Sequence, residues 1–133
     1  MSNLLGFDPG RQKCGLAVVS PDFEVVAQAV VVAEEAIATL VMWCPKYHVD
    51  LLVIGDRTSS KAWQRQIRIA LPQLSLVQVD EHLSSLEARQ RYWQLHPPTG
   101  MAALIPEGMR TPPREIDDLV AVILVERYLR KAS

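Results

Sequence analysis

The N-terminal part of the chain contains two short apolar segments joined by a tight turn that begins with an aspartate. Residues 4–7 form an apolar run that ends at Asp8, Pro9 and Gly10 then turn the backbone, and a second apolar run covers residues 15–19. This pattern predicts a buried strand followed by a neighbouring strand. A carboxylate at the end of a central strand is rigid and poorly solvated, and such groups hold metal ions or orient phosphates. The same residue also fits an ordinary turn, because Asp-Pro and Pro-Gly are common turn dipeptides.

Composition indicates a globular protein without a global attraction for polyanions. Hydrophobic residues make up 49% of the 133 residues, which excludes a disordered chain. The length predicts one domain, residues 1–133. Because the formal net charge is −1, a site for nucleic acid has to come from a local cluster of cations. Cys14 and Cys44 have neither metal-ligand spacing nor a disulfide framework, so we expect two buried thiols in a reducing compartment.

The sequence predicts neither membrane insertion nor secretion. Residues 25–43 form the longest apolar stretch, but polar residues interrupt it too often for a membrane span. The N-terminus lacks a basic region ahead of an apolar core, so we expect no signal peptide and a cytoplasmic location.

Strand and helix patterns alternate along the rest of the chain. A turn at Ser20–Asp22 predicts an antiparallel hairpin between residues 15–19 and 24–32. Apolar residues spaced by three and four predict helices, and short apolar runs bounded by Gly or Pro predict buried strands. The expected helices cover residues 33–47, 60–71, 84–95 and 112–131, and the further strands cover residues 50–55 and 74–79.

Capping signals define the starts of the last two helices. Ser84 and Glu87 form a capping box, and Glu87 can pair with Arg91 one turn later. Thr111 is expected to cap the last helix, with Pro112 in its first turn.

This order of elements predicts an α/β fold. We expect a mixed five-stranded sheet, with three antiparallel strands followed by two parallel strands, and helices on both faces. Ligands of such open sheets bind outside the carboxyl ends of the parallel strands, where Asp8, Gly55 and Glu81 are expected to lie. The Pro-rich segment 97–113 predicts a long loop before the last helix, and long loops in compact domains are usually functional or mobile.

Asp8, Glu81 and Asp117 are the strongest acidic candidates, although each has an ordinary structural explanation. A turn accounts for Asp8, a solvated loop accounts for Glu81, and the helix dipole favours an acid at Asp117. As a group they are more informative, because clustered carboxylates repel one another and need a cation. Oxygen ligands suit Mg²⁺ or Mn²⁺, and two such ions would activate a water and stabilise the leaving oxygen in phosphodiester hydrolysis.

Three segments resemble the motifs of the YqgF/RuvC-like nucleases, which have the ribonuclease H-like fold. Residues 6–18 (GFDPGRQKCGLAV) resemble the opening motif, and residues 79–85 (VDEHLSS) resemble the second motif of the YqgF branch. Residues 117–129 (DDLVAVILVERYL) resemble the third motif, on the last helix. The motifs occur in the family's order and extend over nearly the whole chain. The catalytic acids and the Mg²⁺ or Mn²⁺ ligands that the resemblance implies are Asp8, Glu81 and Asp117.

The resemblance implies a metal-dependent nuclease that acts on structured nucleic acid. Members of this branch are described as Holliday junction resolvases or as nucleases that process pre-16S rRNA, so the implied partner is branched DNA or precursor rRNA. The sequence departs from the branch at three places. His82 stands where the branch usually has arginine, and the segment after Gly55 lacks the usual proline and second glycine. The long loop carries few basic residues, Arg110 and Arg114.

Several side chains near the predicted strand ends are candidates for binding substrate phosphates. They follow Asp8, Gly55 or Glu81 along the chain, lie where a helix start offers N–H donors, or flank the long loop. Each also has the simpler interpretation of a solvated surface residue. These candidates are Arg11, Lys13, Arg57, Ser59, His82, Arg110 and Arg114.

Other interpretations of the same residues stay open. A catalytically weak nucleic-acid-binding or scaffold protein on the same fold is the alternative, motivated by His82, the altered segment after Gly55 and the net charge. Nucleotide binding is weaker, because sugar-kinase and actin-like ATPases share the Asp-x-Gly turn but need a second such domain. The patterns fit DNA or RNA and a monomer or a homodimer. Asp118 is an alternative to Asp117, whose offset to the rest of the motif matches better.

Overall fold

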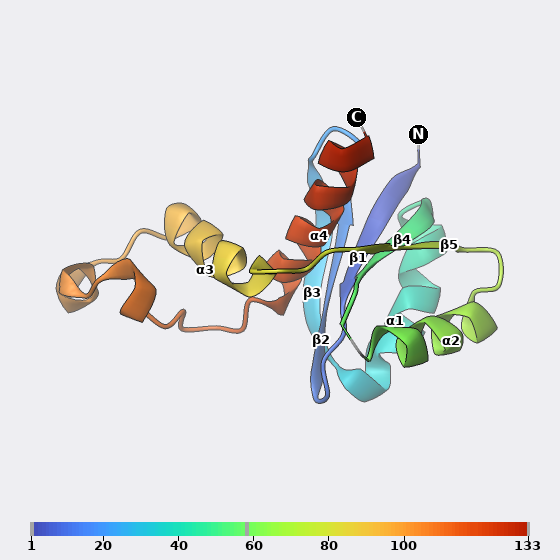
Figure 1. Ribbon diagram of the computed structural model, residues 1–133, viewed down its shortest axis with the longest axis horizontal. Coiled ribbons are helices and arrows are strands. Elements are labelled where there is room, and N and C mark those ends of the chain that lie inside the picture. The colour runs from blue at the N-terminus through green and yellow to red at the C-terminus, as the bar shows by residue number, and fades with distance from the viewer. Residues whose placement is uncertain (1, 58, 133) are drawn as a thin grey trace.

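A mixed sheet of five strands forms the centre of the protein in a computed structural model, which describes residues 2–57 and 59–132 (Figure 1). The strands lie in the order β3-β2-β1-β4-β5. Strands β1, β2 and β3 are antiparallel, and β4 and β5 run parallel to β1. This confirms the predicted arrangement of three antiparallel strands followed by two parallel strands. The strands are β1 Asn3–Asp8, β2 Lys13–Val19, β3 Val25–Val32, β4 Val49–Gly55 and β5 Ser75–Val79.

Helices cover both faces of the sheet, as predicted. On one face α1 (Ala33–Lys46) and α2 (Ser60–Ala70) enclose a core that includes Phe7 and Leu40, and on the other face α4 (Asp117–Ala132) packs on Leu4 and Val53. Because β1 and β4 are covered on both sides, they need continuous apolar runs rather than an alternating pattern. Among the described residues, none of the helices combines the length and the apolarity that a membrane crossing requires.

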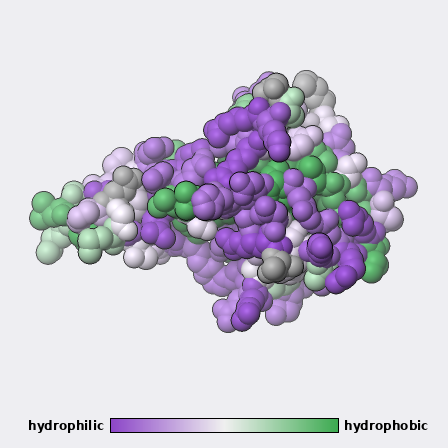
Figure 2. Space-filling view, viewed as in Figure 1, coloured by the Kyte–Doolittle hydropathy of each residue, from purple (hydrophilic) through white to green (hydrophobic). Residues whose placement is uncertain are grey.

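Helix α3 (Ser84–Leu95) packs on α4, and together with the segment that follows it forms an arm that projects from the sheet (Figure 1). The predicted long loop lies in this arm and contains two short 3₁₀ helices, η1 Gly100–Leu104 and η2 Glu107–Met109. Hydrophobic side chains gather at the far end of the arm (Figure 2). Within η1, Met101 and Leu104 are 83% and 84% exposed. The end of the arm therefore adds surface, whereas α3 at its base contributes to a core cluster with α4.

The last helix begins later than the sequence predicts. Helix α4 starts at Asp117, so the predicted cap at Thr111 and the first turn at Pro112 are wrong. A residue that precedes proline is disfavoured in the α region, and Pro112 is itself followed by Pro113, which keeps this stretch out of the helix. The first carbonyl that accepts from the helix is that of Ile116, which receives the N–H groups of Leu119 and Val120.

The predicted capping of α3 is also wrong. Leu83 occupies the N-cap position with a left-handed φ of 59°, and the position makes no side-chain capping bond. The hydroxyl of Ser84 is buried without a hydrogen-bond partner in the part of the chain that the structure describes. Glu87 and Arg91 do not pair with each other but with residues of α4, because α3 lies directly against that helix.

Candidate active site

Asp8 is the last residue of β1, and its carboxylate is buried at the end of the sheet with 7% exposure. Burial first, and the negative charge of Asp117 second, raise the pKa of Asp8 to about 7. Glu81 raises the pKa further, whereas Arg57 lowers it. Within residues 2–57 and 59–132, Asp8 Oδ1 has no hydrogen-bond partner. Asp8 is therefore a buried acid whose negative charge is incompletely compensated.

Glu81 follows β5, and its carboxylate lies over the end of the neighbouring strand β4. A Cβ atom on Gly55 would collide with Glu81 Oε2, so only glycine leaves space for the side chain there. Asp56 Oδ1 accepts the backbone N–H of Glu81 at 3.4 Å, and Arg57 Nε lies 2.6 Å from Glu81 Oε1. Burial raises the pKa of Glu81, and the charge of Arg57 opposes that shift. Among the described residues neither oxygen of Glu81 has a hydrogen-bond partner, and Oε1 alone has the ion pair with Arg57.

Asp117 approaches the same end of the sheet from the first turn of α4. Its backbone carbonyl packs on Gly15, where a Cβ atom would collide with it, and Gly15 is the strand partner of Asp8. Burial is the main cause that raises the pKa of Asp117, and Lys13 and Arg57 lower it. Two glycines, Gly15 and Gly55, thus create the space through which Asp117 and Glu81 come close to Asp8.

Asp118 differs from Asp117 in how its carboxylate is used. Asp118 Oδ1 accepts from Arg114 Nη1 at 3.0 Å and from the backbone N–H of Leu119 at 2.9 Å, and the side chain is buried. Asp117 forms no side-chain hydrogen bond or ion pair with the described residues. This contrast favours Asp117 over Asp118 as the acid available to a ligand.

The three acids lie at one end of the sheet but do not form a ready-made metal site. In the described residues, no three His, Cys, Asp or Glu side chains are arranged to hold a metal ion. The chemistry of the site nevertheless suits a hard divalent cation. Asp8 Oδ1 and Glu81 Oε2 are buried carboxylate oxygens without hydrogen-bond donors, and Mg²⁺ and Mn²⁺ prefer oxygen ligands.

Two of the candidate phosphate-binding cations lie near the acids. Arg57 forms the ion pair with Glu81, and Lys13 acts electrostatically on Asp117 while its ammonium group pairs with Glu115. Both are therefore paired with acids of the protein, although about half of each side chain is exposed.

The remaining candidates have other partners or are exposed. Arg110 Nε donates to the carbonyl of Ile105 at 2.8 Å, and Arg114 is bound to Asp118. Three others are exposed: Arg11 in the turn after β1, Ser59 before α2 without a capping bond, and His82 beside Glu81. His82 also lines a cavity of about 570 Å³ next to the end of β5.

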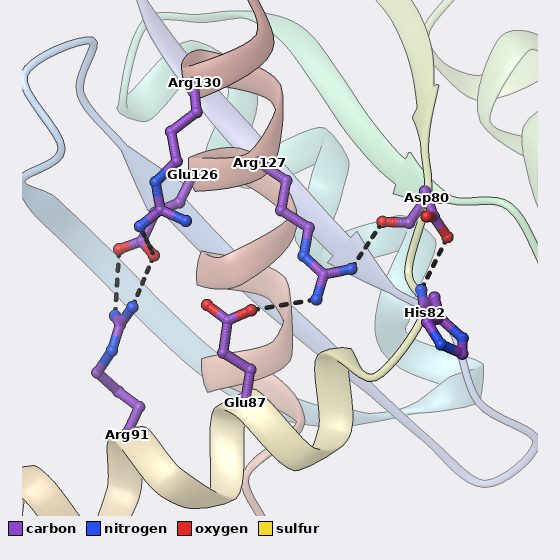
Figure 3. A network of polar contacts seen from close by, with 7 residues as sticks. All are labelled: Asp80, His82, Glu87, Arg91, Glu126, Arg127 and Arg130. Carbon is purple, nitrogen blue, oxygen red and sulfur yellow. Dashed lines mark hydrogen bonds and ion pairs between the residues drawn. The ribbon is translucent and has the colours of Figure 1, made fainter.

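A polar network that the sequence reasoning missed connects the segment carrying Glu81 to α4 (Figure 3). Arg127 donates to the carbonyl of Asp80 at 2.9 Å and pairs with Glu87 at 3.1 Å. Arg91 binds both oxygens of the buried Glu126, at 3.1 and 2.7 Å. A charged residue inside the apolar stripe of the last helix is the sequence signal that could have indicated Glu126.

Comparison with known proteins identifies the fold. No protein-family model and no curated protein matches the chain. Among solved structures, Thermus thermophilus RuvC in complex with a Holliday junction substrate matches with a TM-score of 0.61 and 16% identity over 98% of this chain and 96% of that chain. A second structure of T. thermophilus RuvC matches with a TM-score of 0.59 and 12% identity, over 98% of this chain and 97% of that chain. The chain has the RuvC-like, ribonuclease H-like fold. That part of the resemblance is confirmed, and the YqgF branch stays a prediction.

Proposed function

We propose that this protein is a metal-dependent nuclease that hydrolyses phosphodiester bonds in branched nucleic acid. The observation that carries the proposal is Asp8, a buried carboxylate with an unpartnered oxygen at the end of the central strand. The acids Glu81 and Asp117 lie around it. The fold is that of RuvC, one of whose solved structures holds a Holliday junction substrate.

In this proposal Asp8, Glu81 and Asp117 hold Mg²⁺ or Mn²⁺. Such ions, when bound, activate a water for attack on phosphorus and stabilise the leaving oxygen. Asp8 has to be ionised to act as a ligand, and its pKa is raised to about 7. Cation binding therefore releases a proton from Asp8 near neutral pH, and cation affinity rises with pH through this range.

Cations and hydrogen-bond donors around the acids position the substrate in this proposal. Arg11 and Lys13 extend from the turn after Asp8, Arg57 and Ser59 follow β4, and His82 follows Glu81. Arginine contacts phosphate through two parallel N–H bonds, so Arg11 and Arg57 are the stronger candidates. Arg110 and Arg114 lie on the arm and at its base, where they would contact nucleic acid outside the cleavage site.

A catalytically weak nucleic-acid-binding protein on the same fold is the second candidate. Two observations favour it: the described residues contain no assembled group of three metal ligands, and Arg57 already pairs with Glu81. The two candidates differ in turnover. Only the first requires cleavage that depends on a divalent cation.

A cleavage panel tests the proposal. Purified protein is incubated with Mg²⁺, Mn²⁺ or EDTA and with a four-way DNA junction, a precursor rRNA or single-stranded RNA, and an Asp8→Asn variant serves as the control. We expect cation-dependent cleavage of the junction that Asp8→Asn abolishes. Preferential cleavage of precursor rRNA would assign the rRNA-processing role instead. Cleavage by Asp8→Asn at the native rate would overturn the mechanism, and binding without turnover would select the second candidate.

A further inference from the structure

We propose that Arg57 is the built-in counter-cation of the carboxylate site: it neutralises Glu81 until a divalent ion takes its place, and it is then free to bind a substrate phosphate. The inference rests on the proposed function, because it concerns the ion that this function requires. In this inference Arg57 has two alternating partners, Glu81 and a substrate phosphate.

The contact between Arg57 and Glu81 joins an exposed side chain to a buried one. Arg57 Nε lies 2.6 Å from Glu81 Oε1, yet the Arg57 side chain is 52% exposed whereas that of Glu81 is 7% exposed. Glu81 is held by its backbone bond to Asp56 and by its contact with Gly55. An enclosed carboxylate needs a compensating charge, and the guanidinium supplies it from the solvent side. Arg57 can therefore leave without rearranging the core.

The charge of Arg57 acts at the centre of the acid group. Arg57 lowers the pKa of Asp8, of Glu81 and of Asp117, whereas Lys13 contributes to the lowering at Asp117 alone. A single guanidinium nevertheless leaves Asp8 Oδ1 and Glu81 Oε2 without partners in the described part of the chain. A divalent ion takes several oxygen ligands at once and would satisfy both atoms.

Arg57 and a divalent cation compete for the same carboxylate. Two cations on one carboxylate repel each other, so an ion that binds Glu81 weakens the pair with Arg57 and favours release of the guanidinium. Once displaced, Arg57 remains tethered at the end of β4, next to the site of cleavage, where its planar fork suits a phosphate. Ion and phosphate then favour each other's binding through this one side chain.

Calorimetric titration with MnCl₂ tests the competition directly, without a cleavage assay. The variant is Arg57→Gln, and the matched control is Arg65→Gln, which removes the same charge from an exposed position on α2. We expect Arg57→Gln to bind Mn²⁺ about 10-fold more tightly than the wild type, within the usual range of such couplings. We expect the control to match the wild type. Four-way-junction binding in Ca²⁺ should weaken in Arg57→Gln and stay unchanged in the control.

The outcomes separate this inference from the proposed function. Equal or weaker Mn²⁺ binding by Arg57→Gln would overturn the role of Arg57 and leave the metal-dependent nuclease in place. Absence of Mn²⁺ binding by the wild type itself would overturn the proposed function. If thermal unfolding finds Arg57→Gln unfolded, Arg57→Lys replaces it, since it keeps the charge but not the fork. Arg57→Lys should weaken junction binding, and unchanged junction binding would contradict the phosphate contact.

Discussion

Asp8 occupies a position that disfavours its own negative charge. The ordinary pKa of an aspartate in an unfolded chain is about 3.9, whereas burial, with the nearby charge of Asp117, raises the pKa of Asp8 in the folded protein to about 7. The folded state therefore binds this proton more tightly than the unfolded state does. As the pH rises from about 4 to about 7, Asp8 ionises first in the unfolded chain, and stability falls. Without a cation, the proposed catalytic residue destabilises the fold.

Replacement of Asp8 by Asn tests this loss of folding stability separately from catalysis. In EDTA at about pH 8, Asp8→Asn should be more stable than the wild type by on the order of a few kcal/mol, because the buried charge is absent. Near pH 4 the difference should largely vanish, since Asp8 is then protonated. Thermal unfolding across this pH range measures it, with the exposed Asp50→Asn as the control. A variant less stable than the wild type at high pH would contradict the prediction.

Substitutions of the two glycines beside the acids should have different effects, one on folding stability and the other on the geometry of the site. A Cβ atom at Gly15 would meet the backbone of Asp117, which cannot move without shifting α4, whereas a Cβ atom at Gly55 would first meet the flexible end of Glu81. Gly15→Ala should therefore destabilise the fold by about 1–3 kcal/mol, as overpacking of a core does. Gly55→Ala should lose less stability than Gly15→Ala but should bind Mn²⁺ more weakly than the wild type. Urea unfolding and calorimetry measure the two effects, and equal losses of stability in both variants would contradict the distinction.

At the scale of secondary structure, the sequence determined most of the sheet and little of the contacts between helices. Strands β1 and β4 were predictable because burial on both faces requires continuous apolar runs. The location of Asp8 and Glu81 at one end of the sheet was predictable because parallel strands end on one side of a sheet, whereas Asp117 comes from the start of α4. The partners of Glu87 and Arg91 were not, because local spacing describes one helix and not how α3 packs on α4. The pair between Arg57 and Glu81 likewise joins segments whose approach depends on the register of β4 and β5.

The network between α3 and α4 is expected to hold Glu81 in place. Arg127→Met removes the donor to the carbonyl of Asp80 and the partner of Glu87, and should lower the unfolding free energy by about 1–3 kcal/mol. Because Asp80 precedes Glu81, Mn²⁺ binding should weaken as well. Urea denaturation and calorimetry check both effects. The control is Arg130→Met, because Arg130 is 58% exposed and lies 3.6 Å from Glu126. Equal effects of the two substitutions would argue against a positioning role for Arg127.

At the scale of the whole molecule, few of the cations near the acids are available to nucleic acid. The chain has 14 Lys and Arg residues against 15 Asp and Glu residues. Lys13, Arg57 and Arg114 are already paired with acids in the folded protein. A single copy can thus neutralise only a few phosphates around the acids. A resolvase that cuts two strands would place two copies on one junction and present each set of cations twice, whereas an rRNA-processing nuclease could act as a monomer.

The salt dependence of junction binding distinguishes these two assemblies. Each neutralised phosphate contributes about −0.9 to the slope of log affinity against log salt, so a monomer that contacts two or three phosphates should give about −2 to −3, and a homodimer about −4 to −5. Fluorescence anisotropy in Ca²⁺ between about 50 and 200 mM NaCl measures the slope, and sedimentation gives the stoichiometry. Arg11→Ala should make the slope shallower by about 1 per bound copy. A monomer with a slope steeper than about −6 would require phosphate contacts far from the acids, and the projecting arm would then become the surface to test.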